Sequence, residues 1–482
     1  MKLRPYTVYK DSGLPWLGRV PEHWDLLRAK YLMREINTRS KDESVILLSV
    51  SQYAGVTKRS SREGTEDPDT RSSSLVGYKV AKPGNLVSNI MLAWNGSLGI
   101  APMEGVVSPA YCVYRICIGE PWFFHYLLRS PVYKAEIKRR SRGVVDSRLR
   151  LYTDDFFRIP LLLPNLKEQQ AIVRFVQDLD GKVRRFIRNR RRLIEVLNEQ
   201  KQAIINRAVT RGLDPDVPLK PSGSDWIGDI PEHWEVSPLR RLTVEHCDGP
   251  FGSGLKSSHY VKSGTRVVRL QNIGLAEFKD TDMAYISNEY AASLSRHSVE
   301  AGDVLIAGLG DKRILPGRAC VAPDLLSPAI VKADCFRFRV DTGQVSPFFL
   351  ALQLSATAHI AAGTLGTGAT RMRINLERMS GRPVVLPPLV EQHRIVDALI
   401  SATTEQNKAL SATQSEIDLI REYRTRLISD VVTGKVDVRH LAPPPGSEDL
   451  EEALESFETL EEDIADAVID DEESFNDADL YP

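Results

Sequence analysis

The chain has 482 residues, 42% of them hydrophobic, and this length is typical of two to four domains rather than one. No stretch approaches 18 apolar residues and the first residues lack a signal-peptide pattern, so we expect a soluble, cytoplasmic protein without a membrane partner. The formal net charge is −1, but residues 447–482 contribute −16, so the remainder carries +15. This distribution favours an anionic partner such as nucleic acid.

The first recognisable pattern is "WLGRVPEHWD" at residues 16–25, which returns as "WIGDIPEHWE" at residues 226–235. His23 and His233 recur with it and invite a catalytic interpretation. A residue repeated within a repeated scaffold is more often structural. We therefore expect each histidine to bond locally in its proline turn while the following tryptophan packs beneath.

The segments after the two signatures differ from each other and have a mixed α/β pattern. Residues 120–130, "EPWFFHYLLRS", predict a helix packed on a sheet. Short apolar runs between Gly- and Ser-containing turns predict strands at 45–50, 266–271, 303–308 and 335–340.

A second repeat follows each of these middles. Residues 147–173 align without a gap to residues 370–396, and apolar residues then continue at 3-4 spacing to Ala208 and Val431. Both runs predict long helices, and Asn165 in "NLKE" can cap the first. Because each long apolar stripe needs a partner, we expect the two helices to pair as a coiled coil.

The sequence contains no motif of a self-sufficient enzyme. Residues 363–368, "GTLGTG", lack the GxGxxG spacing and suit a mobile loop, and there is no Walker A, adenine-methylase or HxxxH pattern. We therefore expect no catalytic residue. The five cysteines lack metal-binding spacing, so we also expect no metal. Residues 183–192 hold six arginines, which suit either phosphate contacts or a solvated coiled-coil face with Arg190 setting the register.

The variable middles hold residue types that read base edges, because Arg or Lys can bind guanine and Asn or Gln can bind adenine. Any one of them is also explained by an ordinary surface or core position. Candidates in the first middle are Ser51, Gln52, Asn89, Trp94, Asn95, Ser108 and Tyr111. Candidates in the second are Lys256, Ser257, Arg269, Gln271, Asn272, Lys312 and Arg313. Phosphate contact or interdomain pairing better suits the repeated arginines Arg148, Arg150, Arg371 and Arg373.

Over residues 11–437 the sequence resembles the DNA-specificity (S) subunit of type I restriction-modification enzymes. The resemblance is carried by "DWIGDIPEHW", "DGPFGSGLKSSHY" with "VVRLQNIG", "NIMLAWNGSLGIAPMEGVVSPAY" and the helix starts "LPNLKEQQAIV" and "LPPLVEQHRIV". It implies a non-catalytic subunit that binds double-stranded DNA, two modification (methyltransferase) subunits and restriction (translocase and nuclease) subunits. S-adenosylmethionine, ATP and Mg²⁺ would then be held by those partners, and no cofactor by this chain.

The resemblance and the repeat together predict a mixed α/β architecture of two target recognition domains in a tandem pseudo-twofold repeat, separated by two long helices that pair antiparallel. We place the recognition domains at 1–163 and 213–386, the spacer helices at 164–212 and 387–438, and an acidic, disordered tail at 439–482. Each domain would read one half of an asymmetric bipartite site. Two alternatives are a self-sufficient methylase or nuclease, and a decoy that binds modification subunits without reading DNA.

Overall fold

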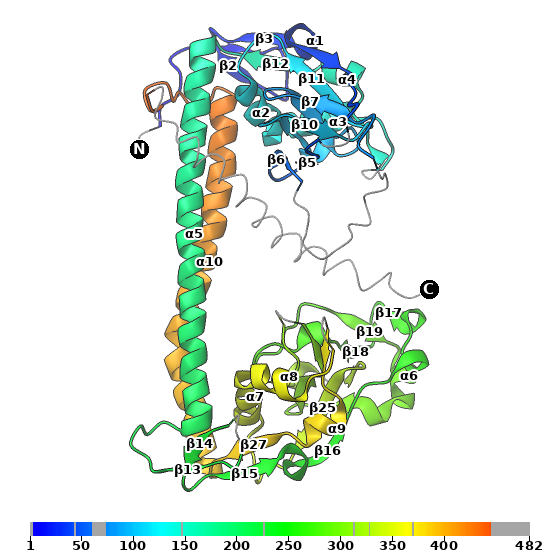
Figure 1. Cartoon of the computed structure of the whole chain (residues 1–482), viewed down its shortest axis with the longest axis vertical. Helices are drawn as coiled ribbons and strands as arrows, with labels where there is room; N and C mark the ends of the chain where they lie inside the picture. Colours follow the sequence, from blue (N-terminus) through cyan, green and yellow to red (C-terminus); the bar gives the residue numbers. More distant parts are fainter. Residues whose placement is uncertain are drawn as a thin grey trace. The chain divides into compact units, whose positions relative to one another are not determined.

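The computed structural model describes residues 3–42, 45–59, 74–145, 148–224, 227–311, 314–326, 328–368 and 371–444. These form a mixed α/β protein of two compact units (Figure 1). Unit 1 comprises residues 1–190 with 414–482, and unit 2 comprises residues 191–413. The mixed α/β class and the long helices are confirmed. The tail prediction concerns residues that, from 445 onward, lie outside the described part.

The two constant ends of the first repeat meet in unit 1. Strand β3 (Asp25–Arg28) pairs antiparallel with β12 (Pro160–Leu163), which brings the tryptophan signature to the start of the first long helix. Unit 2 repeats this arrangement with β15 (Glu235–Pro238) and β27 (Pro383–Leu386). The signature hairpins are β1 (Tyr9–Asp11) with β2 (Arg19–Pro21), and β13 (Leu219–Pro221) with β14 (Asp229–Pro231).

The middle of unit 1 is built on a four-stranded antiparallel sheet, ordered β4 (Met33–Ile36), β11 (Cys112–Ile116), β8 (Leu86–Ser88), β9 (Leu98–Ile100). Its side chains alternate between two cores, because Val87 and Val113 face one hydrophobic cluster while Leu86 and Tyr114 face the other. Smaller pairs are β5 (Leu48–Ser51) with β6 (Gly55–Lys58), and β7 (Lys79–Ala81) with β10 (Gly105–Val107). The helices are α1 (Ala29–Leu32), α2 (Pro121–Arg129), α3 (Pro131–Arg140) and α4 (Thr153–Phe157), and η1 (Ala93–Asn95) is a 3₁₀ turn.

Unit 2 contains the same kind of sheet in the same order: β16 (Thr243–Cys247), β25 (Cys335–Val340), β21 (Val304–Ala307), β23 (Ala319–Val321). It adds a five-stranded sheet of β17 (Tyr260–Val261), β19 (Ala284–Ile286), β18 (Thr265–Val268), β24 (Ala329–Val331) and β20 (Ser298–Val299), in which β18 and β24 are parallel. A further short pair is β22 (Leu309–Gly310) with β26 (Met372–Arg373). The helices are α6 (Asn288–Ser293), α7 (Pro347–Ala356), α8 (Ala358–Leu365) and α9 (Leu376–Ser380).

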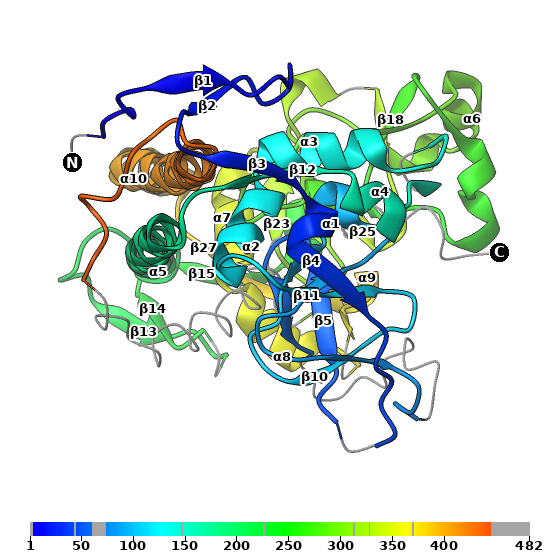
Figure 2. The ribbon, with the colours of Figure 1, turned by 90° about the horizontal axis from the view of Figure 1, so that it is seen from above.

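The two long helices are α5 (Leu166–Arg211) and α10 (Leu389–Val432), and in each unit the local half of one lies beside the local half of the other (Figures 1 and 2). In unit 1, Asp180 of α5 binds Arg424 of α10, and Arg190 binds Glu416. In unit 2, Lys201 donates to Asn407. In unit 2, Val209 further along α5 lies in one core with Ile395, which precedes Asn407 on α10. Increasing numbers on α5 thus meet decreasing numbers on α10 in each unit, so the pairing is antiparallel, as predicted.

Local patterns in the sequence explain where α5 begins and why it continues through a glycine. The Asn165 side chain accepts a hydrogen bond from the Glu168 amide at 3.0 Å, as the "NLKE" pattern predicts. Gly181 stays inside α5 because the surrounding turns continue the apolar stripe. Among the described residues no single helix is long and apolar enough to span a membrane, and only the bent pair α7 and α8 passes by length and composition together.

Candidate nucleic-acid interface

The signature histidines are tied to the starts of the long helices. His23 Nε2 lies 2.9 Å from Glu168 Oε2, and the neighbouring Trp24 Nε1 donates to Glu168 Oε1 at 3.0 Å. In unit 2, His233 Nε2 lies 2.8 Å from Glu391 Oε2. The predicted local bond within the proline turn is therefore wrong, because the partner is a carboxylate about 150 residues further along the chain. The structural interpretation holds, since each histidine joins the signature to a helix.

The first-middle candidates lie at strand ends and in loops of unit 1. Ser51 and Gln52 lie in the β5–β6 turn, where Gln52 is exposed and the Ser51 hydroxyl accepts from the Ala54 amide. Asn89 is buried, and its Nδ2 donates to the Tyr111 hydroxyl at 3.2 Å. Of these four candidates, Gln52 therefore presents the most accessible polar side chain.

The η1 loop carries Trp94 and Asn95. The Lys138 ammonium of α3 lies 4.9 Å from the centroid of the half-buried Trp94 ring, a cation–π contact. The Asn95 Oδ1 accepts from both the amide and the hydroxyl of Ser97, so it shapes the loop. Ser108 has a similar role, because its hydroxyl accepts from the Ala110 amide at 3.4 Å.

The second-middle candidates differ in their exposure. Lys256, Ser257 and Gln271 are exposed. Asn272 is fully buried, and its Nδ2 donates to the carbonyl of Lys279 at 2.9 Å, so it holds a loop. Arg269 is ion-paired with Asp282. Lys312 and Arg313 lie outside the described residues.

The four repeated arginines lie near the surface. Arg148 and Arg371 are exposed, and Arg150 is half-buried. Arg373 Nε donates to Asp334 at 2.7 Å, and its guanidinium lies 5.3 Å from the centroid of the Phe251 ring. Arg373 is therefore paired with Asp334, a residue of its own unit.

Two residues that the sequence did not single out belong to these loop surfaces. Phe251 is 51% exposed, an unusual position for a phenylalanine, and the glycines on either side of "PF" were the available signal. Arg129, the last residue of α2, binds the β5–β6 turn and the η1 loop together. Its position at the end of an apolar helix gave no signal of these distant partners.

His125 of α2 lies behind the same loops and makes unit 1 sensitive to acid. Its Nδ1 accepts from the Ile100 amide at 3.2 Å, which requires an unprotonated nitrogen. Burial lowers the pKa of His125 well below its ordinary value, and the nearby cations Arg129 and Arg424 lower it further. Protonation is therefore resisted in the folded state.

We expect the free energy of unfolding to fall by about 1 kcal/mol between pH 6.5 and 5.5 through His125 alone. A depressed folded-state pKa means that the unfolded chain binds the proton first, so stability is full above about pH 6.5 and declines as the pH falls. His125→Asn, whose amide oxygen can accept the Ile100 bond, should flatten this dependence in urea unfolding of unit 1. The exposed His359→Asn should leave it unchanged, and equal slopes for wild type and His125→Asn would refute the assignment.

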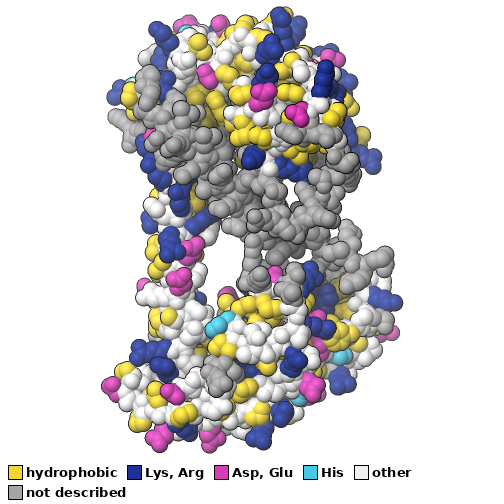
Figure 3. Space-filling model, in the orientation of Figure 1, with side chains coloured by type: hydrophobic (Ala, Val, Ile, Leu, Met, Phe, Trp, Pro, Cys, Tyr) yellow, Lys and Arg dark blue, Asp and Glu magenta, His cyan; other side chains and the backbone are white. Residues whose placement is uncertain are grey.

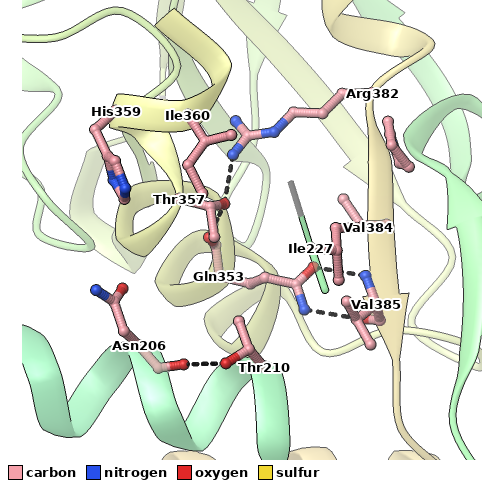
Figure 4. Close-up of a pocket in the computed structure, with 11 residues that line it drawn as sticks. Asn206, Thr210, Ile227, Gln353, Thr357, His359, Ile360, Arg382, Val384 and Val385 are labelled. Atoms are coloured by element: carbon pink, nitrogen blue, oxygen red, sulfur yellow. Dashed lines mark hydrogen bonds between the residues drawn. The ribbon is translucent and has the colours of Figure 1, made fainter. Parts of the chain in front are cut away.

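A cavity of about 210 Å³ lies within unit 2 between the end of α5, the α7–α8 turn and β27 (Figure 4). Two of its polar side chains, Gln353 and Arg382, are hydrogen-bonded within the protein. Gln353 donates to the Val385 carbonyl and accepts from the Val385 amide, and Arg382 donates to Thr357 Oγ1 at 2.6 Å. The cavity wall is thus part of the scaffold that supports β27.

Charged side chains of both signs are scattered over the face seen in Figure 3. Figure 3 shows Lys and Arg interspersed with Asp and Glu on the visible faces of both units and of the helix pair. Within the arginine-rich run of α5, Arg190 pairs with Glu416 and Arg192 pairs with Glu195, while Arg188 is exposed. No group of three His, Cys, Asp or Glu suited to a metal ion occurs in the described ranges.

No protein-family model and no curated protein sequence matches the chain. Several solved structures, however, are similar to the chain. A chain from work on complex assembly and conformational transition of the type I R-M system is 17% identical, with a TM-score of 0.60 over 86% of this chain and 98% of that one. Others are the HsdS subunit from Thermoanaerobacter tengcongensis (16% identity, TM-score 0.45, 88% and 99% covered) and a type I restriction-modification S subunit from M. genitalium (11%, 0.33, 85% and 96%). The first likeness shows a shared fold, in agreement with the resemblance of the motifs.

Proposed function

We propose that this chain is the DNA-specificity subunit of a type I restriction-modification enzyme and reads an asymmetric bipartite DNA site. The observation that carries the proposal is a repeated scaffold with divergent loops. The two units share the strand order of their four-stranded sheets and the pairing of their constant ends, but not the side chains that their loops expose. The fold likeness to a type I R-M structure supports it.

The shared scaffold and the divergent loops of the two units would have different roles in DNA recognition. The shared four-stranded sheets and helix starts carry both loop sets, while different exposed residues give each half its own base preference. In unit 1 an exposed polar candidate is Gln52, whose carbonyl lies close to Gly96 of the η1 loop. In unit 2 the segment after β16 exposes Lys256 and Phe251. The half-sites should therefore differ, and the net charge of +15 outside residues 447–482 suits contact with phosphates.

The proposal includes the partners. The chain would bind double-stranded DNA in the cytoplasm and scaffold two modification subunits together with restriction subunits. It would contribute no catalytic group, and S-adenosylmethionine, ATP and Mg²⁺ would be bound by those subunits. Methyl transfer by the purified chain alone would argue for the self-sufficient enzyme instead.

Exchanging residues 30–145 for the equivalent segment of another specificity subunit should change one half of the methylated motif and leave the other half intact. The physical reason is that these residues form the variable middle of unit 1, whereas β3, β12 and the long helices α5 and α10 stay unchanged. The measurement is genome-wide adenine methylation in cells that express the chain with its modification subunit.

Cells that lack the chain are the control for the motif itself. A split motif that appears only with the chain supports the proposal. Absence of any chain-dependent motif, with a modification subunit shown to be active, would favour the decoy. A change in both halves after the exchange would contradict the assignment of one half-site to each domain.

A further inference from the structure

Arg129 joins two loops of unit 1 through main-chain acceptors. Its Nη1 donates to the carbonyls of Gly96 and Leu98 at 2.8 and 2.9 Å, on the η1 side. Its Nη2 donates to the carbonyls of Gln52 and Tyr53 at 3.0 and 2.6 Å, in the β5–β6 turn. A guanidinium presents up to five N–H donors in a fixed plane, so one rigid group sets the spacing of both loops.

The loops are shaped to reach this guanidinium. Gly55 has φ +83°, and a Cβ there would lie 2.9 Å from His125 Cε1 and 3.4 Å from Arg129 Nη1. A Cβ on Gly99 would lie 3.2 Å from the Gly55 Cα. Both strands therefore approach the end of α2 more closely than side chains would permit.

The charge of Arg129 persists despite its surroundings. Burial, together with a smaller contribution from the nearby Arg424, lowers the pKa of Arg129 to about 10. Since that value is still well above neutral pH, the side chain keeps all its protons. The carbonyl dipoles of the two loops take the place of solvent around it.

Unit 2 has an arginine with the same task at a different position. Arg318, which is 6% exposed, donates to the carbonyls of Leu270 and Ile273 at 2.9 and 2.7 Å, and to Leu315 at 2.9 Å. The segment between Leu270 and Ile273 contains the candidates Gln271 and Asn272. Arg318 thus joins the 3₁₀ turn after β18 to the loop before β23.

The two arginines do not occupy equivalent positions in the two repeats. The helix α7 matches α2 from its first proline, so Ser355 stands where unit 1 has Arg129. The Ser355 hydroxyl is hydrogen-bonded to the main chain of Ala319 and accepts from the Ala276 amide. The ends of α2 and α7 therefore support loops in both units. In unit 2 the guanidinium belongs to Arg318, the residue before Ala319 in the sequence.

We propose that Arg129 and Arg318 are positioning residues, each of which sets the base selectivity of one half-site by fixing the loops that meet the DNA. This inference rests on the proposed function of the chain. Neither guanidinium needs to touch a base, because its effect passes through the main chain of Ser51–Tyr53 and Gly96–Leu98 in one unit, and of Leu270–Ile273 in the other.

The test uses the full chain in complex with its modification subunit. Kd is measured for a duplex with the cognate motif and for duplexes with one base pair substituted in either half. For Arg129→Met we expect discrimination at the first half-site to fall about tenfold, while discrimination at the second stays within about twofold. Arg318→Met should give the converse. Arg139→Met is the matched control, because Arg139 lies 63% exposed on α3 of unit 1, and it should leave both half-sites unchanged.

The lysine variants keep the test decisive if a methionine variant fails to fold. Arg129→Lys and Arg318→Lys retain the charge and the aliphatic stem but offer only three donors from a single nitrogen, so a folded lysine variant should still lose selectivity at its own half-site. Unchanged selectivity in a folded lysine variant, or equal loss at both half-sites, would overturn the inference. A wild-type complex that does not distinguish the duplexes would instead refute the proposed function, and the inference with it.

Discussion

Glu168→Ala should lower the free energy of unfolding of unit 1 by about 3 kcal/mol. The carboxylate is 1% exposed and accepts from the Tyr6 hydroxyl at 2.8 Å and from Trp24 Nε1 at 3.0 Å, while His23 lies 2.9 Å away. Alanine would leave a hydroxyl and an indole N–H buried without an acceptor, each at a cost of about 1–3 kcal/mol. The scaffold of the first repeat therefore depends on one carboxylate.

Glu391→Ala is the matched control in the second repeat. Glu391 is 27% exposed and binds His233, but Trp234 Nε1 has no hydrogen-bond partner in the described structure, so the loss should be about 1 kcal/mol. Because a chain with two compact units need not unfold in one step, the measurement is urea-dependent hydrogen exchange of the β12 and β27 amides. Equal losses in the two repeats would contradict the expectation.

Asp180→Ala should destabilise unit 1 by about 2 kcal/mol. Asp180 is 4% exposed and accepts two hydrogen bonds from Arg424, at 2.7 and 3.0 Å, across the helix pair. The carboxylate raises the pKa of Arg424, so the guanidinium would lose its main source of stabilisation. Arg424 is 38% exposed, and water would compensate part of the loss, which places the expected value below the usual range for a fully buried pair.

Two further variants separate the buried pair from ordinary surface charge. Asp178→Ala removes a partner of Lys182 on the exposed face of the same helix and should change stability by less than about 0.5 kcal/mol. The double variant Asp180→Leu with Arg424→Leu should recover much of the loss, because two apolar side chains leave no unpaired charge. The readout is urea unfolding of unit 1. A loss for Asp178→Ala equal to that for Asp180→Ala would show that the pair contributes nothing specific.

The periodic parts of the fold could be predicted from the sequence. The strand expected at residues 335–340 is β25 without any change of bounds, and both long helices begin within a few residues of their predicted starts. In these segments local spacing and burial agree. The strand expected at 266–271 instead ends at Val268, because the Asn272 side chain accepts from the Arg269 amide and turns the chain into a 3₁₀ turn.

The partners of polar side chains could not be predicted in the same way. His23 meets Glu168, which lies 145 residues later, and no local pattern encodes that distance. An amide such as Asn272 looks the same in sequence whether it reads a base or holds a loop, and here it is buried in the loop. Arg129 resembles an ordinary cation at the end of a helix, because its five acceptors become visible only once the sheet has formed.

Unit 1 is assembled from the two ends of the chain, and this sets an order of events during synthesis. The Asp437 amide donates to the Arg4 carbonyl, and Leu427, Val431 and Val438 lie in the same core as Trp24. A ribosome adds about 5–20 residues per second, so tens of seconds separate the translation of these partners. Unit 2, residues 191–413, is fully translated before unit 1 receives the part of α10 that follows residue 413. The part of the protein that is translated first is therefore the last to close, and a nascent chain must keep that surface from aggregating until α10 arrives.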